Sequence, residues 1–429
     1  MQLQAFTSSR QINDVIVNTS SIVGRGATAT VYKARYDNDD IDHLAAKIYS
    51  SPSKFNAEKI MAMLRSLNQE VYFKPGENKN HIQLAWPVAL LKDNQNQNVG
   101  YLMKLFDKKN SFPLDYYYDS ILFKKMNSPS EAALSFKLEI AKNLSYLVNE
   151  IHSHGHFFID LKPQNILITK DKHLVSFLDC DGFSITDKSG RKFPADLVSM
   201  DYISPEVTKN KLLPKDLDEK QDRYALAVVL FQLLNNGTHP FQGILRNKNL
   251  NSATNDQNAA DELYPYGLEP NNEISPRPQS VHHLWPKELR ELFDKAFIGT
   301  PSQRPSAVAW WKYMKELLAN KELARCPKKP DDVSHIRFKG KGCPACYLET
   351  LSQIKPIQKV TRENKKNKLT ENEATKPTQT TIKQTPPKSS IWESDAFHWT
   401  VGIVALLSIS SGNWWIVVII VLFYIFKDV

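Results

Sequence analysis

Cysteine is scarce in this chain, with 4 residues among 429. So few thiols cannot form the disulfide framework of a small secreted protein, and we expect a reducing compartment. The start of the chain, MQLQAFTSSRQINDVIV, lacks the basic stretch and the apolar block of a secretory signal, so we expect it to stay in the cytoplasm. Hydrophobic residues make up 41% of the sequence, which is ordinary for a globular protein, and the length allows a large core with appendages.

A strong excess of one charge is also missing, because the formal net charge is only +9. Most of this excess is local: between Lys355 and Lys388, nine Lys and Arg residues stand against three Glu, a net of +6. Such a run can attract nucleic acid, but its place just before an apolar C-terminal run argues against nucleic acid and favours anionic lipid. A solvated linker that is kept extended by its own charge explains the run equally well.

Polar residues are concentrated in the run HGHFFIDLKPQNILITKDKHLVSFLDCDGF, which holds Asp160, Lys162 and Asn165 at short spacing. An apolar strand pattern follows, and then Asp179 and Asp181. Acidic and amide oxygens that cluster where a strand meets a loop can hold Mg²⁺ on a nucleotide and orient a hydroxyl nucleophile.

The N-terminal part, Ile12 to Ile48, alternates β-branched and polar residues and predicts strands. Gly24 and Gly26 lie at its first turn, where they allow the backbone to approach a polyphosphate. Lys47 follows on a short apolar strand, where a lone ammonium group is costly unless it meets an anion.

Three sequence features together resemble the eukaryotic-type (Hanks-type) serine/threonine protein kinases: D-x-K-P-x-N with an acidic pair about twenty residues on, GRGATATVYKA, and Ala46-Lys47. The pattern is similar to divergent bacterial, membrane-anchored members with a DxD-type metal motif. The resemblance covers about Ile12 to Ala319. It implies an α+β, two-lobed fold over 12–322, with a β-rich N-lobe to about 105 and a helical C-lobe from about 106.

The resemblance also implies an ATP site. It assigns the following residues to ATP: Gly24, Gly26, Val31, Lys47, Glu58 and Met103. Lys47 is expected to meet the α- and β-phosphates and a glutamate of the helix predicted over Phe55–Leu67. We take Glu58 as that partner and Glu70 as the fallback, against the alternative that Glu58 is an ordinary surface residue.

The implied catalytic residues are Asp160, which orients the substrate hydroxyl and accepts its proton, and Lys162, which steadies the γ-phosphate. Asn165 is expected to bind Mg²⁺ or Mn²⁺, which accept the same oxygen ligands. The second metal ligand is Asp179 by its distance from Asp160, or Asp181 if Asp-Gly-Phe is aligned instead; we prefer Asp179.

Three departures from the family pattern stand out: Ala29 replaces a third glycine, Phe158-Ile159 replaces His-Arg, and Asp-Phe-Gly is absent. The missing arginine suggests that activity is not gated by a phosphate on the activation segment. Farther on, MDYISPEV resembles the end of that segment. Three structural roles follow from the resemblance: Asp222 holds the catalytic loop, and Glu206 and Arg304 form a buried ion pair.

Beyond the kinase-like region, Cys326, His335, Cys343 and Cys346 form C-x8-H-x7-C-x2-C. Two thiolates from one tight turn, completed by an upstream Cys and His, suit a tetrahedral ion, and we predict a small zinc-binding module over 323–350. Free thiols on a loop are the alternative.

The C-terminal part has little to bury until its end. Residues 351–396 are rich in Lys, Thr, Gln, Asn and Pro and predict a disordered basic linker. Residues 397–426 predict a transmembrane segment, because Trp399–Phe426 contains no charge; a re-entrant pair of half-length segments is the alternative. Because Lys and Arg near a membrane segment favour the cytoplasmic side, the linker predicts a cytoplasmic kinase region, attached by a single-pass anchor in the plasma (inner) membrane.

These features together predict a membrane-tethered serine/threonine kinase whose partners are ATP, proteins with Ser or Thr hydroxyls, and membrane lipid. A pseudokinase that serves as a membrane scaffold is the main rival, and the three departures favour it. Lys47, Asp160, Asn165 and Asp179 argue against it, since a scaffold needs none of them. A small-molecule phosphotransferase is a third reading, which the Ser204-Pro205-Glu206 segment disfavours.

Overall fold

The computed structural model describes residues 1–66, 81–106, 108–119, 129–170, 172–246 and 254–353. All of them belong to one compact unit, Met1–Ile357. Glu70, nearly all of the linker 351–396 and the predicted membrane segment 397–426 lie outside the described residues. Within the described part of the chain, no helix combines the length and the apolar character that crossing a membrane requires.

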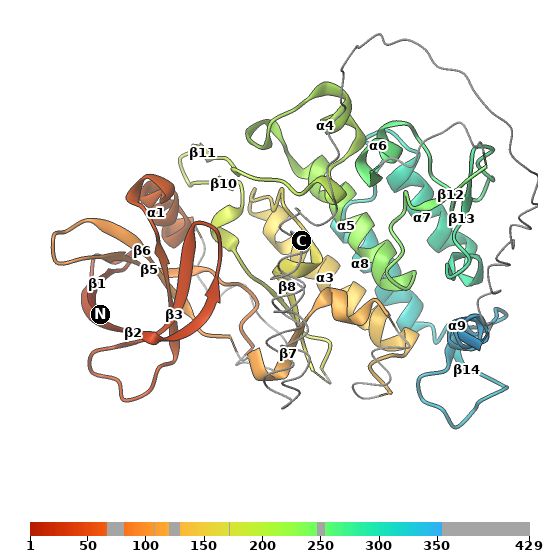
Figure 1. Ribbon diagram of the computed structural model, residues 1–429, viewed down its shortest axis with the longest axis horizontal. Helices are drawn as coiled ribbons and strands as arrows, with labels where there is room; N and C mark the ends of the chain where they lie inside the picture. Colours follow the sequence, from red (N-terminus) through yellow and green to blue (C-terminus); the bar gives the residue numbers. More distant parts are fainter. Residues whose placement is uncertain (67–80, 107, 120–128, 171, 247–253, 354–429) are drawn as a thin grey trace, which may run out of the picture. The chain divides into compact units, whose positions relative to one another are not determined.

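The N-terminal lobe is a closed antiparallel barrel with the strand order β1-β2-β3-β4-β6-β5 (Figure 1). Its strands are β1 (Gln2–Phe6), β2 (Ile12–Arg25), β3 (Ala29–Tyr36), β4 (Leu44–Tyr49), β5 (Pro87–Lys92) and β6 (Asn98–Lys104). The strands expected over Ile12–Ile48 are therefore present as β2, β3 and β4. Strand β1 was not predicted, and it extends this lobe to the N-terminal side of residue 12 because it pairs with both β2 and β5.

Alternation along the strands separates two faces of the barrel wall. Buried apolar side chains from every strand fill the barrel interior: Leu3, Ala5, Val15, Val17, Ala34, Leu44, Ala46, Ala89, Leu91 and Leu102. Because successive side chains of a strand point to opposite faces, Ala45, Lys47 and Tyr49 lie on the outer face of β4. This face is turned toward the rest of the molecule.

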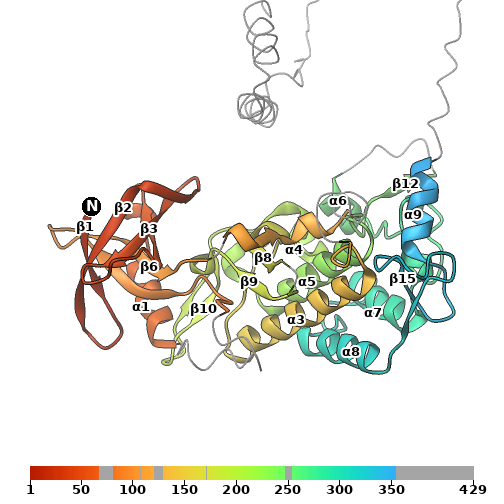
Figure 2. The ribbon, with the colours of Figure 1, turned by 90° about the horizontal axis from the view of Figure 1, so that it is seen from below.

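Helix α1 (Ala57–Ser66) packs on that outer face through Ile60, Met63 and Leu64. Its start is fixed by Asn56, whose side-chain oxygen accepts a hydrogen bond from the backbone N–H of Lys59 (2.9 Å). The helix also lies beside the short strand β10 (Ile185–Thr186), as Figure 2 shows. Helix α1 therefore borders both lobes.

The C-terminal lobe is mainly helical. Its described helices are α3 (Leu134–Ser153), α4 (Pro205–Asn210), α5 (Glu219–Leu234), α6 (Asn255–Ala260), α7 (Lys287–Phe297) and α8 (Ala307–Ala319). Helix α5 is apolar from Tyr224 to Phe231 and buried along most of its length, as expected for a helix at the centre of a lobe. Ring contacts of Phe231 with Trp285, Phe293 and Tyr266 join it to its neighbours.

Short strands accompany the helices of this lobe. The sheet β7-β8-β9 and the two-stranded sheets β10-β11 and β12-β13 comprise β7 (Ser111–Pro113), β8 (Ile166–Thr169), β9 (Val175–Phe177), β10 (Ile185–Thr186), β11 (Lys192–Phe193), β12 (Gly243–Leu245) and β13 (Ile274–Pro276). The segment between α6 and β13 contributes Tyr264 and Tyr266 to the core. Burial of these rings explains why the segment packs on the lobe.

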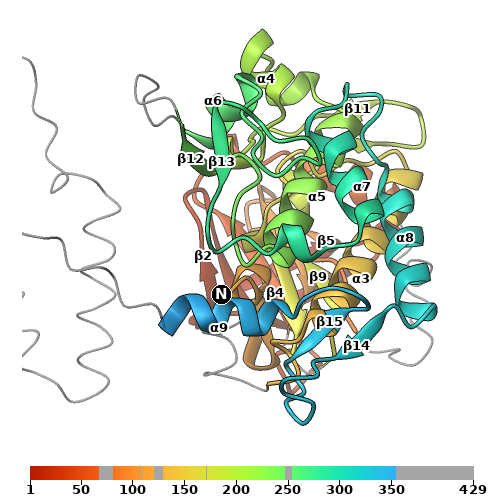
Figure 3. The same cartoon turned by 90° about the vertical axis from the view of Figure 1, so that its right-hand side faces the viewer.

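A small module follows α8. It consists of the hairpin β14 (Leu323–Arg325) and β15 (Ile336–Phe338) and of helix α9 (Pro344–Gln353), which lies next to β15 (Figure 3). Phe338 is buried in the main core of the unit, so the module rests on the helical lobe.

Candidate active site

Strand pairing brings Lys47 next to Tyr101. The two residues face each other across β4 and β6, and Tyr49 lies two positions along on the same face as Lys47. The three polar side-chain ends therefore project from one patch of the barrel wall.

These three side chains converge on Asp181, which comes from the helical lobe. The ammonium group of Lys47 donates to Oδ1 (2.7 Å) and Oδ2 (2.9 Å) of Asp181. Tyr101 donates its hydroxyl to Oδ1 (2.8 Å), and Tyr49 donates to Oδ2. Both carboxylate oxygens are thus fully engaged, which makes Asp181 an anchor between the two lobes.

Charge keeps this buried pair ionised. Burial acts to raise the pKa of Asp181, but the charge of Lys47 and the hydrogen bonds from Lys47, Tyr49 and Tyr101 outweigh it and lower that pKa. Burial likewise acts to lower the pKa of Lys47, but Asp181 and Asp179 raise it. At neutral pH the lysine is a cation held by a carboxylate from the opposite lobe.

Glu58 is not the partner of Lys47, and that prediction was wrong. Its side chain is 69% exposed and pairs with Arg191 on the β10-β11 hairpin (2.6 Å). The cap at Asn56 sets the start of α1 so that Lys59, one position later, faces inward instead. The predicted glutamate therefore lies on the wrong side of the helix.

Lys59 is a residue of this site that the sequence did not reveal. It is buried, and its ammonium group donates to the carbonyl oxygen of Pro194 (3.1 Å). Burial lowers its pKa, against the opposing effect of Asp196 and Asp181, and the charge of Lys47 lowers it further. Helix α1 thus buries a lysine near Lys47 and Asp181, where the family pattern expects a glutamate.

Asp179 differs from Asp181 in its exposure and bonding. Its side chain is 60% exposed, and its Oδ1 lies 3.2 Å from the Lys47 ammonium. Its backbone has φ of 52°, in the left-handed region that non-glycine residues adopt mostly at special sites. The Leu178 N–H donates to the Asn165 carbonyl (2.8 Å), which ties the strand before Asp179 to the loop carrying Asn165.

Asp160 and Lys162 lie together, as their spacing implied. The Lys162 ammonium donates to Asp160 Oδ2 (2.5 Å) and to the hydroxyl of Ser199 (2.9 Å). The backbone N–H of Ser199 donates to Asp160 Oδ1 (2.8 Å). Ser199 was not predicted; it belongs to the segment before Ser204-Pro205-Glu206 and links that segment to Asp160.

Asp222 holds the backbone just before Asp160, in the position expected for it. Its carboxylate, fully buried, accepts hydrogen bonds from the N–H groups of Phe158 and Ile159, both 2.7 Å. Ile159 has φ of 61°, which is strained for a β-branched residue, so these two bonds help to keep it there. Phe158 packs against Phe177, 4.5 Å between ring centroids, in place of the usual polar pair.

The expected ion pair between Glu206 and Arg304 is also present. Arg304 Nη1 and Nη2 donate to the two carboxylate oxygens at 2.6 and 2.7 Å, and the guanidinium stacks on Tyr224. Burial acts to raise the pKa of Glu206, but Arg304 lowers it. This bidentate pair fixes the end of the activation-segment region to the helical lobe.

The remaining predicted ATP residues lie on the barrel. Gly24 and Val31 pair across the β2-β3 hairpin, and the Gly26 N–H donates to the Ala29 carbonyl (2.9 Å) at its tip. Met103 pairs with Ala45 on β4 and is almost buried. Their contribution to nucleotide binding stays a prediction.

Gly100 is a further residue that the sequence analysis missed. A side-chain carbon at this position would lie 2.0 Å from the Lys47 carbonyl oxygen, so only glycine fits here. The close approach fixes β6 against β4 at Lys47. A single glycine within an apolar strand pattern was the available signal.

Comparison with known proteins now decides the family. The sequence model of the family described as "Protein kinase domain" matches residues 17–318 of this chain. The chain belongs to this protein kinase family. Among relatives, the chain is 24% identical to "Protein kinase YegI" of Escherichia coli strain K12 over 363 residues, which cover 82% of the chain and 51% of the relative.

Two further relatives of the chain carry similar names. "Probable serine/threonine-protein kinase irlC" of Dictyostelium discoideum is 30% identical over 230 residues, covering 52% of the chain and 14% of the relative. "Probable serine/threonine-protein kinase CPE1738" of Clostridium perfringens strain 13 / Type A is 24% identical over 310 residues, covering 72% and 38%. The chain spans about half the length of "Protein kinase YegI" and less than half the length of the other two relatives.

Protein kinases use ATP with Mg²⁺, and the donor set at this site fits that ion. The carboxylate of Asp179 is exposed. Leu178, just before Asp179, is hydrogen-bonded to the backbone of Asn165, so oxygen donors of the kind that Mg²⁺ prefers come from adjacent segments. Asp181 fits less well because its oxygens already accept four hydrogen bonds.

Proposed function

We propose that this chain is an active serine/threonine protein kinase that transfers the γ-phosphate of ATP to protein hydroxyl groups. The observation that carries the proposal is the meeting of Lys47 from the barrel with Asp179 from the helical lobe, 3.2 Å apart. A cation for the phosphates and an exposed carboxylate for their metal ion thus lie at one point.

Asp160 is the proposed catalytic base. Two neighbours fix its carboxylate, Lys162 through its ammonium group and Ser199 through its backbone N–H. A substrate hydroxyl that approaches Asp160 would be oriented by a group that is already in place, which is where most of the rate enhancement in phosphoryl transfer arises. Lys162 also supplies positive charge beside Asp160, which would stabilise the negative charge that develops on the γ-phosphate.

Asn165 and Asp179 are the residues we assign to Mg²⁺, or to Mn²⁺, which accepts the same ligands. When bound, this ion neutralises phosphate charge and holds the polyphosphate in one geometry. Asp181 has a different role in this proposal. It is a positioning residue that fixes the ammonium group of Lys47, the role that Glu58 was predicted to have.

Phosphoamino-acid analysis tests this proposal. The full chain, purified in mild detergent, is incubated with γ-labelled ATP, Mg²⁺ and casein, and the labelled protein is hydrolysed. We expect label on phosphoserine or phosphothreonine, and none when the Lys47→Met variant replaces the native chain. Label recovered only in free phosphate or in a small molecule would overturn the assignment.

A pseudokinase that serves as a scaffold is the second candidate. The exposed position of Glu58 favours it, because active protein kinases ordinarily pair their strand lysine with that helix glutamate. On this alternative, Mg²⁺ and ATP would raise the thermal unfolding midpoint of the native chain while no label reached casein. Equal label on the native and Lys47→Met proteins would favour it too.

Membrane tethering is a further proposal, and it rests on the sequence. The uncharged run Trp399–Phe426 and the net charge of +6 between Lys355 and Lys388 support a single anchor in the plasma (inner) membrane, with the kinase region in the cytoplasm. Alkaline carbonate extraction of cell membranes tests the anchor: the full chain should stay in the pellet. Release into the supernatant would point to surface adsorption through the basic linker instead.

A further inference from the structure

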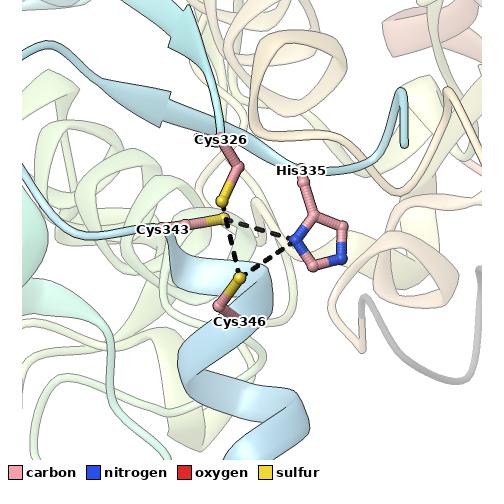
Figure 4. A group of neighbouring side chains, drawn as sticks. All are labelled: Cys326, His335, Cys343 and Cys346. Atoms are coloured by element: carbon pink, nitrogen blue, oxygen red, sulfur yellow. Dashed lines mark hydrogen bonds between the residues drawn. The ribbon is translucent and has the colours of Figure 1, made fainter. Parts of the chain in front are cut away.

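The module after helix α8 brings together four side chains that take no part in phosphoryl transfer. Cys326 follows β14, His335 precedes β15, Cys343 directly precedes α9, and Cys346 lies in the first turn of α9. One sulfur or nitrogen atom from each lies within 4.8 Å of every other. Figure 4 shows the three thiols and the imidazole pointing toward one another.

We propose that these four residues bind one Zn²⁺ ion in a structural Cys₃His site that holds the module together. The ligand atoms would be the sulfurs of Cys326, Cys343 and Cys346 and Nδ1 of His335. Three thiolates and one imidazole, with all four positions taken by protein, are the donor set of closed, structural zinc sites.

Distances between the donor atoms agree with a tetrahedral ion. A Zn–S bond of about 2.3 Å separates two sulfurs of such a site by roughly 3.8 Å, and a sulfur from a nitrogen by a little less. The Cys326 and Cys346 sulfurs are 3.5 Å apart, and His335 Nδ1 lies 3.6 Å from Cys343 Sγ and 3.3 Å from Cys346 Sγ. A disulfide requires sulfurs only about 2.05 Å apart.

The far side of the imidazole is arranged as zinc ligands require. His335 is fully buried, and its Nε2 lies 3.1 Å from Glu349 Oε1 and 3.5 Å from Asp332 Oδ2. Such carboxylates hold the proton on Nε2 and leave Nδ1 as a lone-pair donor toward the sulfurs. Glu349 is itself held by Lys329 through its other oxygen (2.6 Å).

The module is too small to be stabilised by its own hydrophobic core alone. The segment Leu323–Gln353 is shorter than the roughly 40 residues below which a chain rarely supports its own core. Its buried apolar side chains are few: Cys326, Phe338 and Leu348. A metal ion that joins the hairpin to α9 would supply stability that this small core does not.

The ion would also hold α9 against the kinase domain. Tyr347, next to the ligand Cys346, donates its hydroxyl to the Pro278 carbonyl (2.7 Å) and packs on His283 (4.9 Å between ring centroids). Fixing Cys343 and Cys346 therefore fixes these contacts as well. Zinc would act here as a structural element of the domain and would take no part in phosphoryl transfer.

Metal analysis of the full chain in mild detergent, purified without chelators, tests the proposal. We expect about one zinc per chain in the native protein and in Cys180→Ala, the matched control, because Cys180 lies outside the module. Cys343→Ser and Cys346→Ser should each lose most of the metal, and Glu349→Gln should bind zinc about 10- to 100-fold more weakly.

A second readout covers variants that fail to fold. The native chain, stripped of metal by a chelator, is titrated with Co²⁺, and a thiolate-bound tetrahedral ion gives a visible absorption that added Zn²⁺ abolishes. Less than about 0.5 zinc per chain together with no such absorption would overturn the site, as would a Cys326–Cys346 disulfide or bound iron found in its place. None of these outcomes depends on kinase activity, so they are separable from the test of the proposed function.

Discussion

Replacing Asp181 with Asn changes one charge at the junction of the two lobes. The substitution keeps the size of the side chain but removes the carboxylate to which Lys47 donates at 2.7 and 2.9 Å. An amide nitrogen would also take the place of one acceptor, and it would face a donor from Lys47, Tyr49 or Tyr101. Lys47 would then be buried without its main anion.

The expected cost follows from the burial of this pair. The Lys47 and Asp181 side chains are only 12% and 13% exposed. Breaking a buried ion pair from one side costs about 3–5 kcal/mol, which lowers the unfolding midpoint by roughly 6–10 °C. Lys47 would lose its fixed position as well, and we expect kcat/KM for ATP to fall about 100-fold.

Glu58→Gln is the matched control, because it removes a carboxylate from the residue that family resemblance assigns to Lys47. Its pair with Arg191 is exposed, with the two side chains 69% and 60% accessible, and such pairs contribute about 1 kcal/mol or less. We expect its unfolding midpoint and its kcat/KM to stay close to native. Thermal unfolding and initial rates on all three proteins would refute the reasoning if Glu58→Gln lost more activity than Asp181→Asn.

Three further substitutions test other parts of the fold. Burial lowers the pKa of Lys137 to about 7, against 10.5 for an ordinary lysine. Between these two pH values the unfolded chain binds this proton more strongly than the folded chain, so the stability of the native protein should rise with pH. Lys137→Met should remove this rise, as measured by thermal unfolding midpoints between pH 7.5 and 9. Gly100→Ala should destabilise the chain by about 1–3 kcal/mol, whereas Gly182→Ala, which has open space, should not. Arg304→Met breaks the bidentate pair of a buried arginine and should lower the free energy of unfolding by about 3–5 kcal/mol. Arg223→Met breaks a more exposed pair and should lower it by about 1 kcal/mol or less. Denaturant unfolding of both variants measures the difference.

Residues set by short, fixed spacings were predictable from the sequence. Asp160 and Lys162 are two positions apart on one loop, so any fold of that loop keeps them close. The Glu206–Arg304 pair was predictable for a different reason. It joins residues far apart in the chain, and only family resemblance, not local pattern, could relate them.

The sequence could not predict which side of helix α1 is buried, and so could not predict which of its residues lies near Lys47. Glu58 and Lys59 are neighbours in sequence, but they lie about 100° apart around α1, and the Asn56 cap together with packing decides which one is buried. Tyr49 and Tyr101 looked like ordinary apolar strand residues. Their hydroxyl groups acquire a role only because the folded chain brings Asp181 to them.

Barrel closure escaped prediction for a related reason. Strand β1 contains only five residues, and its own pattern does not distinguish a barrel strand from a tail. It is defined by pairing with β2 on one side and with the distant β5 on the other. Contacts of this kind depend on the whole sheet and cannot be read from a short window.

The initial rate of γ-phosphate transfer to protein serine or threonine tests the central claim most directly. The full chain and its Asp160→Asn variant are compared at saturating ATP and Mg²⁺, with thermal unfolding showing that both are folded. If Asp160 is the base held by Lys162 and Ser199, the native rate should exceed the variant rate by about 100-fold or more. Equal rates, or no transfer by either folded protein, would contradict the account.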